Sequence, residues 1–153
     1  MLIIDSREKQ WEHIKDYLER NNIPYQVTKL DVGDYMNTEH PNIVIDRKAN
    51  LQEVCSNLQS GKENIHRFMK ECRRARDNKI ELVVLIEGTK YKDLTDAKLW
   101  KSKYTQHTGD WLVRQMKALI YAFDIQWKFC KRNETAKKIL EILHYEGVED
   151  NGR

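Results

Sequence analysis

The sequence contains few of the residues that crosslink, kink or break a chain. Of its 153 residues, six are glycine, two are proline and three are cysteine. The cysteines, Cys55, Cys72 and Cys130, form no Cys-x-x-Cys motif and have no accompanying histidine pair, so we expect neither a disulfide framework nor a zinc site. No apolar run approaches the roughly 20 residues that cross a membrane. These absences exclude a collagen, a disulfide-rich secreted domain and a transmembrane protein.

The composition is that of one globular domain. Hydrophobic residues make up 40% of the chain and charged residues 33%. A chain of this length buries roughly 68–70% of its unfolded surface, so it can fold without a metal or a disulfide. We expect a single domain over residues 1–147 and a disordered tail over residues 148–153. The segment Met1–Asp5 reaches an acid too early for a signal peptide, and we expect a reducing cytoplasm.

The net charge, 27 − 24 = +3, permits nucleic-acid binding without indicating it.

Apolar patterning predicts strands and helices that alternate along the chain. The first three strands suggest a meander, and no firm structure is predicted for residues 89–107. Ser6, Asp110 and Asn133 are predicted helix N-caps. Interleaved strands and helices indicate an α/β sheet with helices on its faces. The predicted strands cover residues 1–5, 25–30, 31–36, 43–45, 80–86 and 125–129, and the predicted helices cover 8–21, 51–58, 65–77, 110–123 and 133–143.

Four acids occur in or just after predicted strands, namely Asp5, Asp34, Asp46 and Glu87. In α/β sheets, ligands gather outside the carboxyl ends of the strands. Carboxylates that converge there repel one another unless a cation relieves the repulsion. Hard divalent ions such as Mg²⁺ or Mn²⁺ prefer oxygen ligands. Each acid alone is more often a turn residue or a helix cap, so the grouping carries the inference.

The spacing of Asp46 and Lys48 adds a specific geometry. Residues two apart in a strand point to the same face, so this carboxylate and this ammonium group would lie side by side. Such a pair alone is usually a solvated pair on an edge strand. Together with Gly33-Asp34 and eleven intervening residues, it becomes the pattern of a metal-dependent nuclease, in which a lysine beside the attacked phosphate stabilises charge.

These motifs resemble the nuclease domain of the XPF-type structure-specific endonucleases. Four segments occur in the family's order, namely Asp5-Ser6-Arg7-Glu8, Leu30-Asp31-Val32-Gly33-Asp34-Tyr35, Val44-Ile45-Asp46-Arg47-Lys48 and Val84-Leu85-Ile86-Glu87. The family signature is Gly-Asp, a short gap, Glu-Arg-Lys, three residues and Asp. The resemblance implies a restriction-endonuclease-like fold, with a three-layer α/β/α core and a central mixed sheet. It also implies a Mg²⁺ or Mn²⁺ cofactor and cleavage of branched or flapped DNA.

The resemblance assigns a role to each matching position. Asp34 and Asp46 would be metal ligands, and Lys48 would orient the water or stabilise the developing charge. Asp5 would be a supporting acid and metal ligand, and Arg7 a phosphate or scaffold contact.

The sequence departs from the family signature at two positions. Asp46 replaces the expected Glu and remains a carboxylate. Gln52 stands where the final Asp is expected, and a one-residue shift would give its role to Glu53, although neighbouring helix residues face about 100° apart. Glu53 and Glu87 are therefore the weaker site candidates.

Two basic stretches are candidate DNA contacts, together with Arg47. The side chains of Arg67, Lys70 and Arg74 share one helix face, which would meet phosphates or be a solvated face. Lys101 and Lys103 lie among Tyr91, Trp100 and Tyr104. Those aromatic rings would either stack on unpaired bases or anchor a long loop, and the sequence does not decide between the two.

The sequence therefore predicts a metal-dependent DNA endonuclease that acts at branched, flap or single/double-strand junctions, as in DNA repair or recombination. The alternatives are an inactive DNA-binding scaffold of the same fold and a nuclease that cuts plain duplex. The tandem helix-hairpin-helix module of the family is not present in these residues, so substrate choice would come from the nuclease domain itself or from a separate partner. Family analogy also suggests a homodimer through the last two helices and a bacterial or bacteriophage source.

Overall fold

The computed structural model describes residues 1–59, 61 and 63–145. Its centre is a six-stranded mixed sheet with the strand order β2-β1-β3-β4-β5-β6. The β1–β2, β4–β5 and β5–β6 pairs are parallel, whereas β3 is antiparallel to both of its neighbours. The strands are β1 (Leu2–Asp5), β2 (Tyr25–Thr28), β3 (Tyr35–Asn37), β4 (Ile43–Lys48), β5 (Glu81–Ile86) and β6 (Gln126–Phe129).

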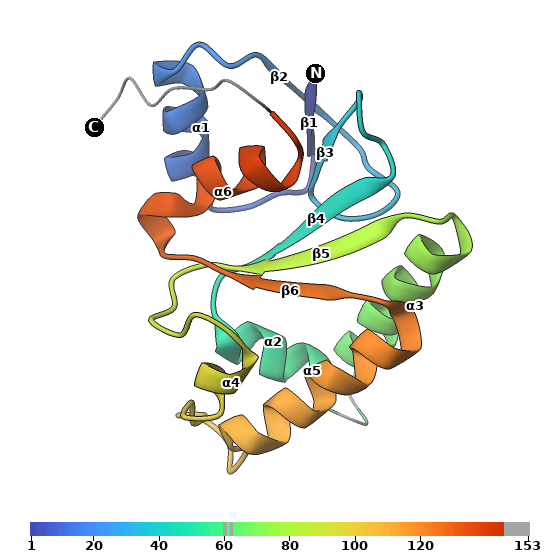
Figure 1. The fold of residues 1–153 in the computed structure, drawn as a ribbon, viewed down its shortest axis with the longest axis vertical. Coiled ribbons are helices and arrows are strands. Elements are labelled where there is room, and N and C mark those ends of the chain that lie inside the picture. The colour runs from blue at the N-terminus through green and yellow to red at the C-terminus, as the bar shows by residue number, and fades with distance from the viewer. Residues whose placement is uncertain (60, 62, 146–153) are drawn as a thin grey trace.

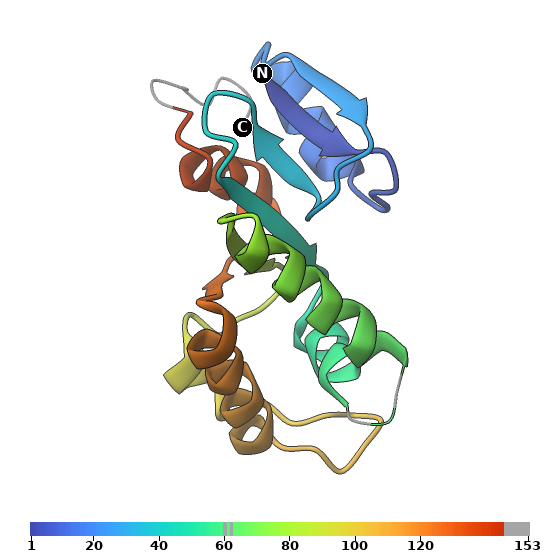
Figure 2. The ribbon, with the colours of Figure 1, turned by 90° about the vertical axis from the view of Figure 1, so that its right-hand side faces the viewer.

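Helices cover both faces of the sheet, which confirms the predicted three-layer α/β/α core (Figure 1). One face packs against α1 (Glu12–Arg20) and α6 (Thr135–Ile142). The other packs against α2 (Leu51–Leu58), α3 (Glu63–Asp77) and α5 (Gly109–Phe123), with the short α4 (Leu94–Ala97) beside α5. Figure 2 shows α2, α3 and α5 grouped together, away from α1.

Two hydrophobic clusters fill the spaces on either side of the sheet. Ile4, Ile45 and Leu85 belong to the cluster under α1 and α6. Val44 and Val84 belong to the cluster under α2, α3 and α5. Neighbouring strand residues contribute to opposite clusters because successive side chains point to opposite faces. This alternation also decides which polar side chains of β4 share a face.

The predicted meander is wrong. β1 pairs with β2 in parallel and with β3 in antiparallel orientation, so it lies between these two consecutive strands. Helix α1 makes the crossover that a parallel pair requires.

The three predicted N-caps are also wrong. Ser6 is held by its backbone N–H, which donates to the Thr28 carbonyl at 3.1 Å, and α1 starts only at Glu12. Thr108, two residues before Asp110, caps α5 by accepting from the Trp111 N–H. Asn133 lies inside a 3₁₀ turn, η1 (Arg132–Glu134), that precedes α6.

The strand directions bring the predicted acids to one edge of the sheet. β1, β4, β5 and β6 run the same way, so their carboxyl ends lie together, and β3 runs the opposite way and begins at that edge. Asp5 and Lys48 therefore end β1 and β4, and Glu87 directly follows β5, beside the start of β3, which Asp34 precedes.

Three other sequence expectations concern the whole chain. Cys55, Cys72 and Cys130 are buried and free of disulfide bonds. None of the helices within the described ranges is long and apolar enough to cross a membrane. The predicted tail, residues 148–153, lies outside the described residues.

Candidate active site

Strand β4 separates the functional candidates by its alternation. Val44 belongs to the cluster on the α2/α3 side, so Asp46 and Lys48, two and four residues further on, share that side. Ile45 belongs to the opposite cluster, and Arg47 shares its side. The Nζ of Lys48 lies 3.4 Å from Oδ2 of Asp46, so the structure brings together the acid and the lysine as the sequence predicts.

Gly33 allows Asp34 to lie beside β4. Gly33 has a φ of +71°, and a Cβ there would lie 2.9 Å from the Ile45 carbonyl oxygen, so the backbone passes closer to β4 than other residues allow. The Asp34 N–H donates to that carbonyl at 2.7 Å, and Oδ2 of Asp34 accepts from the Arg47 N–H at 2.8 Å. These bonds hold the Asp34 carboxyl next to Asp46.

Lys48 remains protonated in this environment. Burial alone would lower its pKa, but the neighbouring carboxylates of Asp46 and Glu53 raise the pKa above the ordinary lysine value. The Nζ lies 4.0 Å from Oε2 of Glu53 and 5.2 Å from the centre of the Phe68 ring. A charged ammonium group can stabilise negative charge on a reacting phosphate.

A third acid, Glu71 of α3, joins the site and was missed in the sequence. Burial and repulsion from Asp46 raise its pKa to about 7, and the same two causes raise the pKa of Asp34 well above the usual range. Glu71 follows Phe68 by three residues and precedes Ala75 by four, and both of these are buried. This helical spacing places an acid on the inward face of α3, and that pattern in the sequence could have identified Glu71 as a site residue.

Two buried oxygens of this cluster accept no hydrogen bond of good geometry, namely Oε1 of Glu71 and Oδ2 of Asp46, although the Lys48 ammonium group lies 3.4 Å from the latter. Burial also raises the pKa of Asp46, although Lys48 opposes that shift. Buried carboxylates with free lone pairs fit a hard divalent cation. In the described ranges, no three His, Cys, Asp or Glu side chains are arranged to hold one metal ion. Mg²⁺ commonly binds through one or two carboxylates, waters and phosphates, so this donor set suits Mg²⁺ or Mn²⁺.

The raised pKa of Glu71 makes a prediction about stability. The folded pKa of about 7 lies above the ordinary 4.5, so the carboxylate costs stability above pH 7 and the cost disappears as pH falls towards 4.5. We expect Glu71→Gln to stabilise the metal-free protein by about 2 kcal/mol near pH 8. The gain should vanish near pH 4.5. Thermal melts in EDTA at both pH values measure it.

Glu63→Gln is the matched control, because Glu63 is exposed in the first turn of the same helix. Its melting temperature should match the wild type at both pH values. A destabilised Glu71→Gln variant near pH 8 would contradict the prediction.

Asp5, predicted as a supporting acid and metal ligand, is hydrogen-bonded by neighbouring groups of the protein. Oδ1 accepts from the Leu30 N–H at 2.8 Å, and Nε of Arg7 donates to Oδ2 at 3.0 Å. Burial would raise the pKa of Asp5, but these hydrogen bonds hold it below the usual range. Asp5 therefore anchors Arg7 and the chain at Leu30, and of the two predicted roles of Arg7 the structure shows the scaffold contact.

Arg47 and Glu87 form a buried ion network on the opposite face. Nη1 of Arg47 pairs with Oε1 of Glu87, and Nε pairs with Glu8 at 2.9 Å. The exposed fraction of the Arg47 side chain is 6% and that of Glu87 is 1%. Oε2 of Glu87 also lies 2.8 Å from Nε2 of His13 and accepts from the Thr135 hydroxyl. This geometry gives Arg47 and Glu87 a structural role, and the DNA contact predicted for Arg47 stays a prediction.

The first turn of α2 sets the contacts of the Gln52 and Glu53 side chains. Asn50 caps the helix by accepting from the Glu53 N–H at 2.8 Å, and Oε1 of Glu53 accepts from the Ala49 N–H at 2.8 Å. Glu53 is thus a capping residue that also faces Lys48. Gln52 points elsewhere, and its Oε1 accepts from the Ser102 hydroxyl at 2.9 Å.

Exposed cations surround a groove beside the acid cluster. The groove has a volume of about 1100 Å³, and its lining includes Arg7, Lys29 and Arg74. Arg7 interacts electrostatically with Asp34 and Glu71, which places this groove next to the acids. Arg67 and Lys70 are exposed on α3, and Lys101 and Lys103 on the loop before α5.

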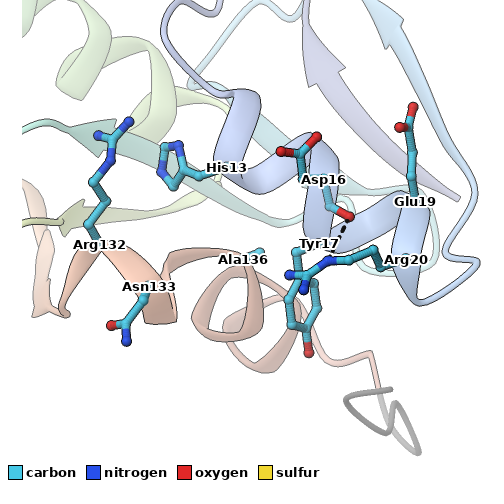
Figure 3. A pocket seen from close by; sticks show the side chains of 8 residues that line it. All are labelled: His13, Asp16, Tyr17, Glu19, Arg20, Arg132, Asn133 and Ala136. Carbon is cyan, nitrogen blue, oxygen red and sulfur yellow. Dashed lines mark hydrogen bonds between the residues drawn. The ribbon is translucent and has the colours of Figure 1, made fainter. Parts of the chain in front are cut away.

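A second pocket, of about 570 Å³, lies between α1 and the η1–α6 segment (Figure 3). His13, Asp16, Glu19 and Arg132 give its wall mixed charge. It lies on the α1/α6 side of the sheet, whereas Asp46 and Lys48 share the α2/α3 side. We therefore place the candidate active site at the β3–β4 edge, where these two residues lie.

The three-layer core and the acids and lysine at one sheet edge define a restriction-endonuclease-like protein. The family model described as "ERCC4 domain" matches residues 4–142, and the chain belongs to this family, which includes the XPF nuclease domain. No curated protein sequence matches it.

Two solved structures share this fold. The chain superposes on XPF from Aeropyrum pernix with a TM-score of 0.69 and 18% sequence identity, covering 94% of this chain and 63% of that one. It superposes on the same protein in complex with DNA with a TM-score of 0.69 and 17% identity over the same shares. This chain thus spans less than two thirds of those proteins.

Proposed function

We propose that this protein is a divalent-metal-dependent DNA endonuclease that hydrolyses phosphodiester bonds at branched, flap or single/double-strand junctions. The observation that carries the proposal is the grouping of Asp34, Asp46 and protonated Lys48 at one sheet edge. The ERCC4 family membership supports the same class of activity.

Asp34 and Asp46 would hold Mg²⁺ or Mn²⁺, with Glu71 close enough to bias the charge of the site. When bound, the ion supplies Lewis acidity to the scissile phosphate and the attacking water. Lys48 faces the same space and stabilises the negative charge that develops on phosphate oxygens. Phe68 and Glu53 hold the lysine chain in place.

The groove beside the cluster offers a path for the DNA backbone. Arg7, Lys29 and Arg74 would neutralise phosphates along it, because each cation releases counterions from DNA. Arg67 and Lys70, on the exposed side of α3, would extend this contact.

Several finer points belong to the same proposal. A homodimer through α5 and α6, a separate DNA-targeting partner and a cytoplasmic location in a bacterial or phage-infected cell follow from the family resemblance. The dimer or the partner would add to the junction selectivity of the nuclease core.

The second candidate is an inactive scaffold of the same fold. Gln52 favours it, because this side chain stands where the family has an Asp and is engaged by Ser102. The third candidate is a nuclease that acts on plain duplex.

The deciding experiment incubates the purified chain with labelled flap, fork and linear duplex DNA in Mg²⁺, Mn²⁺ or EDTA. We expect metal-dependent cutting, faster on flap and fork than on linear duplex. Equal rates on all three would favour the plain-duplex nuclease. No cutting above the level of an Asp46→Ala/Lys48→Ala variant would overturn the proposal in favour of the scaffold.

A further inference from the structure

We propose that residues 98–108, here called the 98–108 loop, bind an unpaired nucleic-acid strand by stacking a base on Tyr104. The inference rests on the proposed function, because it assigns the part of the substrate that this nuclease would recognise. It concerns a surface separate from the acid cluster. Figure 2 shows the segment before α5 running along the end of the molecule formed by α2, α3 and α5.

The aromatic residues of this region divide into two groups by burial. Tyr91 and Trp100 pack against the hydrophobic cluster under α2, α3 and α5, so they anchor the loop. Tyr104 is 81% exposed. Tyr91 and Trp100 are therefore held by packing, whereas the ring of Tyr104 is exposed to solvent. A ring this exposed can stack on a base.

The loop is held in one shape by its own hydrogen bonds. Lys101 and Thr108 form a bridge between the two arms, and the Gly109 N–H donates to the Trp100 carbonyl at 2.6 Å. The buried Ser102 hydroxyl oxygen accepts from the backbone N–H groups of Tyr104 and Thr105 at 3.2 and 3.0 Å. Because the tip is already ordered, stacking on Tyr104 would carry a small entropic cost.

The charge of the loop matches a nucleic-acid backbone. Residues 98–108 include Lys98, Lys101 and Lys103 but no Asp or Glu. All three lysines are exposed, and two of them lie within three residues of Tyr104. A base-stacking ring flanked by lysines suits an unpaired strand, since the faces of bases inside a duplex are covered by their neighbours.

Ser102 connects the loop to the catalytic edge. Its hydroxyl donates to Gln52, and Gln52 sits beside Glu53, the residue that faces Lys48. Gln52, which stands where the family signature has an Asp, therefore links the 98–108 loop to α2, the helix that follows Lys48. An unpaired strand on Tyr104 would thus be held at a set place relative to the cleavage site.

The test measures binding by fluorescence anisotropy in EDTA, with a labelled oligothymidylate of about 15 nucleotides and a blunt duplex of equal length. We expect Tyr104→Ala to raise the Kd for the single strand on the order of tenfold, and Tyr104→Phe to restore it. The Kd for the duplex should change by less than about twofold. Tyr121→Ala removes a ring that is 91% exposed on α5 and should leave both Kd values unchanged.

The proposal is overturned if Tyr104→Ala leaves single-strand affinity unchanged or weakens duplex binding equally. This outcome is separable from failure of the proposed function, because the binding assay needs neither metal nor cleavage. A protein that shows the Tyr104 effect and cuts no substrate would keep the loop assignment and lose the nuclease. If the protein cuts flap DNA and Tyr104→Ala leaves the single-strand Kd unchanged, the nuclease proposal stands and the loop assignment is lost.

Discussion

Lys48→Ala is expected to lower the rate of DNA cleavage by on the order of 10²–10³-fold. The Lys48 Nζ lies 3.4 Å from Asp46, and its raised pKa keeps it charged, so the variant removes a fixed cation from the proposed site of phosphate attack. Single-turnover cleavage of a labelled flap substrate at saturating Mn²⁺ measures the rate, and anisotropy measures DNA affinity. We expect the affinity to change by only a few fold, because the groove cations remain.

Lys15→Ala is the matched control, since Lys15 is exposed on α1 on the other face of the sheet. It should cleave at the wild-type rate. Lys48→Ala also leaves Asp46 without its ion pair, so a melting curve must show that the variant is folded. A folded Lys48→Ala protein with the wild-type cleavage rate would remove Lys48 from the mechanism.

Arg47→Ala is expected to destabilise the protein by about 3 kcal/mol, because the buried Glu87 loses its buried cation and keeps only His13, Thr135 and the more exposed Arg132 as partners. The melting temperature should fall by roughly 10 °C. Arg47→Lys should recover only part of the loss, because Arg47 contacts Glu8, Glu87 and the Lys9 carbonyl through three different nitrogens. Denaturant unfolding of the three proteins gives the free energies.

The double variant Arg47→Met/Glu87→Gln tests the cause. Removing both charges should recover part of the stability lost in Arg47→Ala, since the Glu87 carboxylate, the more buried of the two acids that Arg47 pairs with, is then neutral. The same proteins also test the sequence prediction that Arg47 contacts DNA. An Arg47→Ala protein of unchanged stability and weakened DNA affinity would support that prediction and contradict the ion network.

Local patterns account for the parts of the fold that were predicted correctly. The run Ile80–Ile86 and the β-branched residues before Asp46 indicate buried strands, and both became central strands of the sheet. The pairing of Asp46 with Lys48 follows from the two-residue period of a strand. The largest error concerns contacts between distant segments, because the place of β1 between β2 and β3 does not follow from local spacing. The cap of α5 is a local contact between Thr108 and the Trp111 N–H, and the sequence offered Asp110 as a competing cap two residues away.

The sequence by itself determined the alternation of strands and helices, the strand-end acids and the shared face of Asp46 and Lys48. These features depend on backbone periods that act over a few residues. Only the tertiary structure decided which of these acids remain available. Hydrogen bonds from Arg7 and Leu30 occupy Asp5, and a buried arginine occupies Glu87. Glu71 reaches the site because α3 packs against the sheet, where burial and Asp46 raise its pKa. Such contacts depend on packing between segments far apart in the chain, which no local pattern records.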